Sequence, residues 1–226
     1  SSVQVPDARL ESLYHAGLYQ LACNAAGRLP PTAQGIWTPD GELASAGVPD
    51  YHLDLNVEES YWPVYTANHL ELAGPLYETF HALLPRFTRF CREFYGWEGA
   101  MATGTLAPNG ARVPCWWTTD YWTGGGPWVA HHFWLHYLYS GDETFLRERA
   151  YPLMRAFMRF YVGFLERGDD GLYHVPWDNS PEWESNRGEA WGWDVTATLA
   201  LIRFLAQALL RCQAILALDD PEAPRW

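Results

Sequence analysis

Apolar and polar residues alternate along the first half of the chain with the period of amphipathic helices. Apolar positions recur every three or four residues over 8–26, 57–68 and 72–95, which predicts three helices. Asp7 stands where an N-cap is expected, and Gly27 stands where the first of these helices would end.

The second half of the chain repeats this pattern. Helices are predicted over 127–139, 145–166 and 191–218, with a bend at Pro152 and a tight turn at 140–142. No regular succession of strands and helices indicates a parallel sheet. About six helices joined by alternately short and long loops favour an all-α fold. Successive hairpins with their long loops at one rim suggest an α/α toroid.

The segment from Trp177 to Glu184 concentrates chemically active side chains on a predicted loop. It combines three carboxylates, an amide and two indoles, and Pro181 excludes the interior of a regular helix. Apolar walls raise the pKa of a carboxyl group, which suits a general acid, and indole faces stack on the C–H faces of sugar rings. A surface loop with acidic caps and an aromatic anchor is the alternative interpretation.

A second polar cluster is predicted where the long loop 28–56 meets the second helix. The segment 51–56 alternates polar and apolar residues, so His52, Asp54 and Asn56 are expected on one face of an extended strand. These side chains could orient a water molecule or hold sugar hydroxyls, and they could equally cap the helix that follows.

Composition and charge narrow the classes of partner. The 226 residues include 13 Trp, 13 Tyr and 10 Phe, and several tryptophans fall in predicted loops, as in a carbohydrate-binding cleft. The formal charge of −12 argues against a nucleic-acid partner. We expect no membrane span, since no apolar run approaches the required length. The N-terminus shows no signal-peptide pattern and no initiator Met, so the chain is expected to be cut from a longer one of undetermined compartment.

Cysteine and histidine spacing predicts neither a metal site nor a cofactor. The cysteines at 23, 91, 115 and 212 are far apart and are expected to be buried free thiols. The histidines at 131, 132 and 136 lie on a predicted helix without a carboxylate at ligand spacing. The glycines at 124–126 precede this helix and are a weak signal for a phosphate cradle.

Four motifs together resemble glycoside hydrolase family 95, a family of inverting α-L-fucosidases with an (α/α)6 barrel. Residues 54–63 read Asp-Leu-Asn-Val-Glu-Glu-Ser-Tyr-Trp-Pro, similar to the family's Asn-x-Asn-x-Glu-x-Asn-Tyr-Trp-Pro. Gln-Gly-Ile-Trp at 34–37, Thr-Asp-Tyr-Trp at 119–122 and Ser-Pro-Glu at 180–182 resemble three further family motifs. The likeness spans roughly residues 28–205.

The chain departs from the family pattern in two ways. Asp54 and Ser60 replace two asparagines of the motif at 54–63, and nothing resembles the Asp-Gly-Asn-Phe-Gly segment that carries the family's catalytic aspartate. A complete barrel also needs about twice the predicted helices. The resemblance therefore implies that residues 1–226 form a single-domain fragment, about the first half of a six-hairpin toroid.

The resemblance also implies a role for individual residues. Glu182 would protonate the departing glycosidic oxygen, Asn56 would hold the nucleophilic water, and Asp54 would share the base role or contact a hydroxyl. The residues expected to shape the sugar pocket are Trp37, Glu58, Trp62, Asp120, Trp122, His132 and Trp183. Each of them also fits a core position, Trp62 above all.

Three alternatives remain open from the sequence. The first is another toroid enzyme, such as an α-L-galactosidase or a phosphorylase, and the second is a catalytically incomplete glycan-binding fragment. The third, a helical scaffold without a ligand, leaves the loop tryptophans and acids unexplained. The expected partners are an oligosaccharide and either the second half of the barrel or another copy, because an open half-toroid exposes apolar helix faces.

Overall fold

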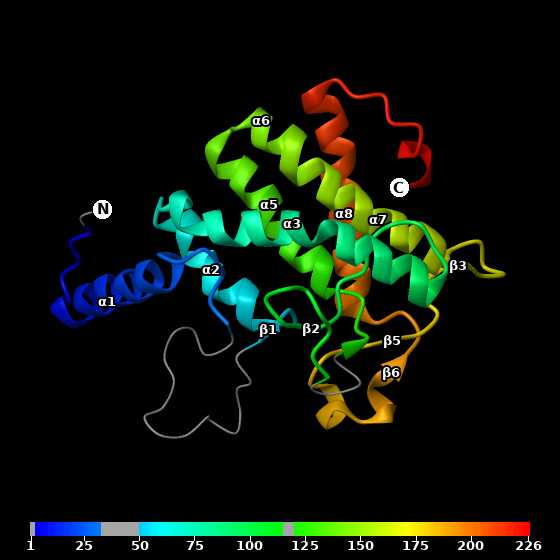
Figure 1. Cartoon of the computed structure of the whole chain (residues 1–226), viewed down its shortest axis with the longest axis horizontal. Coiled ribbons are helices and arrows are strands. Elements are labelled where there is room, and N and C mark those ends of the chain that lie inside the picture. The colour runs from blue at the N-terminus through cyan, green and yellow to red at the C-terminus, as the bar shows by residue number, and fades with distance from the viewer. Residues whose placement is uncertain (1–2, 33–49, 115–119) are drawn as a thin grey trace.

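The computed structural model describes residues 3–32, 50–114 and 120–226, and helices dominate it (Figure 1). The longer helices of this described part are α1 (Ala8–Ala25), α2 (Asn56–Thr66), α3 (Gly74–Phe90), α5 (Gly125–Ser140), α7 (Tyr151–Phe164) and α8 (Thr196–Leu216). Short helical segments are η1 (Leu70–Ala73), η2 (Cys91–Tyr95), α6 (Glu143–Phe145), η3 (Leu146–Ala150), η4 (Trp183–Asn186), η5 (Gly188–Ala190) and η6 (Ala223–Arg225). The predicted all-α class is confirmed.

In the described part of the chain, six two-residue strands form three antiparallel ladders, and Leu106 also makes an isolated bridge with Arg112. The pairs are β1 (Tyr51–His52) with β2 (Thr105–Leu106), β3 (Glu166–Arg167) with β4 (Tyr173–His174), and β5 (Asp178–Asn179) with β6 (Trp191–Gly192). Each ladder joins two segments of irregular chain, so the strands fix the long loops and form no sheet of their own.

Local sequence signals set several helix boundaries, including the predicted Asp7 cap. The Asp7 carboxylate accepts a hydrogen bond of 2.8 Å from the Arg9 amide and caps α1. Gly141 ends α5 with a φ of 69°, and Asp142 caps the next helix by accepting a bond of 2.9 Å from the Phe145 amide. The tight turn between α5 and the α6–α7 segment is therefore confirmed.

Two predicted helices change character along their length. The helix predicted over 72–95 begins as a 3-10 turn and ends in the π-helix η2, while the π-helix η3 precedes α7. Pro152 lies in the first turn of α7, directly after η3, so the expected bend coincides with a change in helix type. A proline lacks the amide hydrogen of a regular turn, which accounts for the irregularity at this point.

The start predicted for the last helix was wrong by five residues. The helix begins at Thr196, because Trp191 and Gly192 pair as strand β6 with β5 instead. This pairing closes the loop that carries Glu182.

The core lies where α8 packs on α5 and α7, α2 on α5, and α3 on α7. Large side chains that are fully enclosed there include Phe80, Phe133, Phe157, Phe160 and Tyr161. Burying a side chain of this size contributes about 1.5–3 kcal/mol, so these contacts dominate the stability of the helical arrangement.

The glycines at the start of α5 permit close packing. A Cβ atom at Gly126 would lie 2.3 Å from Cε1 of Phe157, and one at Gly124 would lie 2.2 Å from Cζ2 of Trp122. Larger residues would push α5 away from α7 and from Trp122. Packing therefore explains these glycines without the phosphate cradle that the sequence weakly indicated.

The expectation that no apolar run approaches the length of a membrane span was wrong for helix α8. It has the length and composition to cross a membrane, with a mean hydropathy of 1.6, properties that it shares with core helices of soluble proteins. Its buried side includes Leu205, Leu209 and Cys212, which face the helices against which it packs. Leu199, Ile202 and Phe204 pack partly buried against the core, whereas Leu210 is 46% exposed.

The cysteines of the described part are free. Cys91 and Cys212 are buried and Cys23 is half-buried, while Cys115 lies outside the described residues. For the first two, the prediction of buried free thiols is confirmed.

Candidate functional site

The segment leading into α2 carries the first group of acids. Strand β1 pairs with β2, and the His52 ring nitrogen Nε2 lies 2.7 Å from Oδ1 of the buried Asp50. Asp54 is half-buried, and Asn56 is exposed as the first residue of α2. The predicted shared face is therefore only partly formed, because the strand ends at His52 and a helix begins at Asn56.

Glu58 is a buried acid inside the first turns of α2. Its side chain is fully enclosed, and neither carboxyl oxygen has a hydrogen-bond partner among the described residues. Burial raises the pKa of Glu58 well above its usual value; its own backbone amide opposes this effect and Asp54 adds to it. Glu58 therefore favours the neutral, protonated form.

Asp54 connects this group of acids to the second loop. Burial raises the pKa of Asp54, His52 lowers it, and the negative charges of Glu182 and Asp50 raise it further. The carboxyl groups of Asp54 and Glu182 thus lie within electrostatic reach, although they are far apart in the sequence. The fold brings together the two acids on which the sequence-based mechanism depends.

Glu182 lies at the tip of a loop with a closed base. The Asp194 amide donates to the Val175 carbonyl at 3.0 Å, and Nδ1 of His174 lies 2.6 Å from Oδ2 of Asp194. Glu182 itself is exposed and has a φ of 64°, in the left-handed region that residues other than glycine rarely adopt. Trp183 beside it is 63% exposed. The loop therefore presents an acid and an indole to solvent from a fixed base.

Asp178, in the same loop, points into the protein. Its carboxylate accepts hydrogen bonds from the Thr123 hydroxyl at 2.6 Å and from the Thr198 hydroxyl at 2.7 Å. Burial raises the pKa of Asp178 to about 6, and these hydrogen bonds oppose the shift. Asp178 holds the loop against the starts of α5 and α8, so of the two acids Glu182 is the one exposed at the surface.

Asp120 and Trp122 lie inside the fold. Asp120 accepts a bond of 2.6 Å from the Thr105 hydroxyl and pairs with Arg112 at 3.3 Å. Trp122 is 1% exposed, and its indole nitrogen donates to the Thr198 hydroxyl at 3.2 Å. These contacts support the strands and the loop of Glu182. A direct contact of either residue with a sugar stays a prediction.

His132 is also enclosed. Its Nδ1 atom lies 2.9 Å from the Tyr65 hydroxyl, and burial lowers the pKa of His132 to about 3, so the ring is neutral. Trp62 differs from the expectation of a core residue, since it is 40% exposed and packs at 6.5 Å between ring centroids on Trp128. Trp37 lies outside the described residues.

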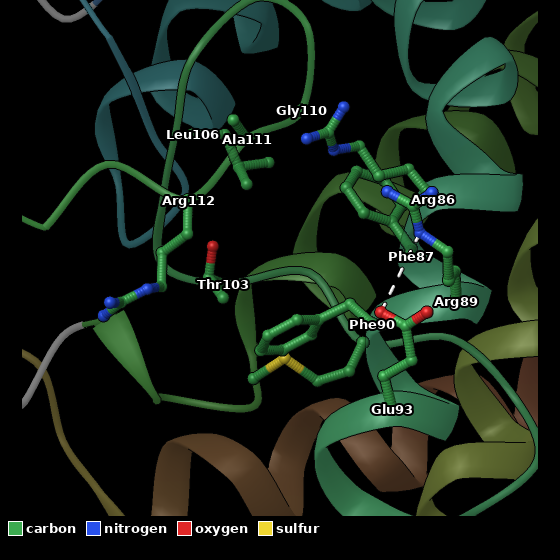
Figure 2. A pocket seen from close by; sticks show the side chains of 11 residues that line it. Arg86, Phe87, Arg89, Phe90, Glu93, Thr103, Leu106, Gly110, Ala111 and Arg112 are labelled. Carbon is green, nitrogen blue, oxygen red and sulfur yellow. Dashed lines mark ion pairs between the residues drawn. The ribbon is translucent and has the colours of Figure 1, made fainter.

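A pocket of about 150 Å³ lies beyond these acids, between the end of α3 and the segment 101–112 (Figure 2). Arg89 and Glu93 form an exposed ion pair of 4.0 Å at its edge, and Arg86 extends alongside Gly110. None of the predicted site residues that the structure describes lines this pocket. Its connection to them runs through Arg112, which pairs with Asp120.

Sequence reasoning missed the structural roles of Asp50 and Asp178. Nothing in the pattern distinguishes Asp50 from other loop acids, because its partner His52 is recognisable only once β1 has formed. Asp178 belongs to the segment 177–184 that the sequence analysis identified. Its side chain points into the protein because its strand β5 pairs with β6. Both are acids that the fold uses to hold the site.

Comparison with known proteins identifies the family. Residues 2–226 match the glycosyl hydrolase family 95 catalytic domain. Alpha-L-fucosidase 2 of Arabidopsis thaliana is 30% identical over 181 residues, which cover 76% of this chain and 21% of that protein. Probable alpha-fucosidase A of Aspergillus niger is 31% identical over 180 residues, covering 75% of this chain and 22% of that protein.

A further relative carries a different name. Kojibiose hydrolase of Flavobacterium johnsoniae is 29% identical over 132 residues, which cover 55% of this chain and 18% of that protein. The chain thus spans about a fifth of the length of the curated relatives it matches. The match over nearly all of its residues shows that the chain belongs to the glycosyl hydrolase family 95 catalytic domain family.

Proposed function

We propose that this chain forms part of a glycoside hydrolase that removes a terminal α-L-fucosyl residue from oligosaccharides with inversion. The observation that carries the proposal is the approach of Glu182 to Asp54, strong enough for the charge of one to raise the pKa of the other. Two relatives named as fucosidases support the choice of sugar.

Glu182 acts as the general acid in this proposal. It is exposed at the tip of a loop whose base and interior acid are fixed, so its carboxyl group can reach a glycosidic oxygen. Protonating the departing oxygen avoids an alkoxide leaving group and contributes a rate factor of about 10²–10⁴. Trp183 would cover one face of the sugar.

Asp54 and Asn56 act on the water molecule. Inverting glycosidases separate their two carboxyl groups by about 6.5–9.5 Å, which leaves room for a water opposite the leaving group. Asn56 orients this water through its exposed amide, and Asp54, with its raised pKa, accepts a share of the proton. The principal base would come from the second half of the barrel.

The proposal extends to the shape of the domain. Helix α8 keeps Leu210 exposed and Leu199, Ile202 and Phe204 only partly buried, as expected of a hairpin that packs against a further one. We infer that residues 1–226 supply about half of an (α/α)6 barrel. Another copy of the chain could cover the same surface.

A second candidate is a hydrolase of the same fold with another sugar specificity. Two observations favour it: Asp54 replaces a family asparagine, and one relative is named as a kojibiose hydrolase. A carboxylate beside the sugar would favour different hydroxyl positions from an amide, since it only accepts hydrogen bonds.

The experiment assays this chain and a version extended by downstream sequence on aryl α-L-fucoside and aryl α-L-galactoside. Each form is compared with its Glu182→Gln variant and with Glu184→Gln as a matched control. We expect turnover that falls at least about 10²-fold in Glu182→Gln only. Turnover by the extended form alone would place the principal base beyond residue 226. Equal activity in Glu182→Gln would refute the role of Glu182.

A further inference from the structure

An aromatic groove lies beside the loop of Glu182 and takes no part in the mechanism above. Its volume is about 330 Å³, within the range of about 300–1,000 Å³ typical of ligand pockets. Seven residues line it: Phe94, Tyr95, Tyr121, Thr123, Phe164, Trp177 and Trp191.

Two stacked ring pairs form the groove. Trp177 stacks on Trp191 with ring centroids 6.0 Å apart, and Phe94 stacks on Tyr121 at 5.4 Å. Trp177 and Phe94 are nevertheless 57% and 55% exposed. Trp177 and Phe94 are thus held in place by their partners and still keep a large apolar surface in water, where covering it is favourable.

The lining specifies the chemistry of an occupant. No lining residue is charged, and the one cation recorded against a lining ring, Arg112 at 5.3 Å from the Tyr121 centroid, is paired with Asp120. The hydroxyls of Tyr95 and Tyr121 form no hydrogen bond with the described residues, and a purely apolar occupant would leave them unpaired. A pyranose ring satisfies both demands, because its C–H face carries partial positive charge toward an aromatic ring and its rim carries hydroxyls.

The groove lies close to Glu182 along the chain. Trp177 precedes Glu182 by five residues, a distance of at most about 18 Å along an extended chain. Thr123 lines the groove and also holds Asp178 of the same loop. A general acid faces the glycosidic oxygen, and the leaving sugars lie beyond that oxygen.

We propose that this groove binds a neutral pyranose of the leaving oligosaccharide, one or two units beyond the scissile bond. The inference rests on the proposed function for the identity of the scissile bond. It adds a subsite that makes the enzyme prefer oligosaccharides over simple glycosides.

The kinetic test compares two substrates in the extended protein. α-L-Fucosyl fluoride has no leaving sugar, whereas an α-L-fucosyl trisaccharide built on lactose has two. We expect Trp177→Ala and Phe94→Ala each to raise the KM ratio of trisaccharide to fluoride about tenfold, the scale of one aromatic contact. Trp193→Ala is the matched control, since this indole is 60% exposed and lies outside the groove. An unchanged ratio in both groove variants would overturn the proposal.

A binding measurement separates this proposal from the proposed function. Lactose, the leaving group of the trisaccharide, is titrated by ligand-observed NMR into the chain and into the Trp177→Ala and Trp193→Ala variants. Binding that weakens about tenfold only in Trp177→Ala supports the groove even if no substrate is hydrolysed. No lactose binding, together with a lower unfolding midpoint in Trp177→Ala, would show that protein fills the groove and would overturn the inference.

Discussion

The Thr123 hydroxyl donates a hydrogen bond of 2.6 Å to the Asp178 carboxylate and so ties the loop of Glu182 to the start of α5. Thr198 at the start of α8 donates to the same carboxylate at 2.7 Å. Two helices therefore hold one loop through a single buried acid. The position of Glu182 depends on this junction.

Removing the Thr198 hydroxyl should weaken the junction. Thr198→Val deletes the bond to Asp178 and the bond that Thr198 accepts from Trp122. Because both partners are buried, we expect a loss of about 2–3 kcal/mol in the free energy of unfolding. Denaturant unfolding measures this loss, and Thr196→Val, at an exposed position of the same helix, is the control.

The same variant should alter the pH dependence of stability. The pKa of folded Asp178, about 6, exceeds the unfolded value of 3.8, so folding binds a proton between these two pH values. The free energy of unfolding therefore falls as pH rises from 3.8 to about 6. Losing a donor to the carboxylate raises this pKa further. The fall should therefore be larger in Thr198→Val and extend above pH 6. Parallel pH profiles for variant and parent would contradict this account of Asp178.

Glu58→Gln should stabilise the protein at neutral and higher pH. The pKa of folded Glu58 is raised by burial, so its stability contribution declines as pH rises from the unfolded pKa toward the folded one. Glutamine has a similar shape and cannot ionise. We expect the thermal midpoint of the variant to exceed that of the parent above pH 7 and to approach it near pH 4. Glu59→Gln, at the exposed neighbouring position, should show no such divergence.

Asp54→Asn tests whether this carboxylate shares the base role. If it does, the variant should lower kcat for an α-L-fucoside about 10²-fold and remove the rise of activity with pH that follows ionisation of Asp54. Ser60→Asn restores the family residue at the other position that departs from the motif, without changing charge. This variant should keep the rise of activity with pH. A gain in fucoside turnover in Asp54→Asn, with a loss of galactoside turnover, would instead assign Asp54 to sugar recognition.

Local signals predicted much of the helical framework. Asp7 and Asp142 cap their helices through amides two or three residues away, so the sequence pattern alone locates these starts. The start of α8 was misplaced because Trp191 and Gly192 pair with residues far back in the chain. Pairing of this kind depends on the complete fold, so the spacing of apolar residues along the sequence does not predict it.

The candidate site was predictable to a similar extent. Asp54 and Glu58 are only four residues apart at a helix start, so their electrostatic coupling could be expected from closeness in the sequence. The approach of Glu182 to Asp54 required a resemblance or a structure. Burial of Trp122 and His132 depended on packing, because a motif specifies the residue type and not the direction of its side chain.

The left-handed backbone at Glu182 sets stability against activity. A non-glycine residue in this region costs roughly 1–2 kcal/mol, which glycine avoids. Glu182→Gly should therefore unfold at a higher denaturant concentration than Glu182→Gln, although both lack the acid; equal midpoints would mean that the loop holds no strain. A library selected for thermal tolerance alone would then drift toward glycine at this position and lose the proposed general acid, so its selection must include turnover.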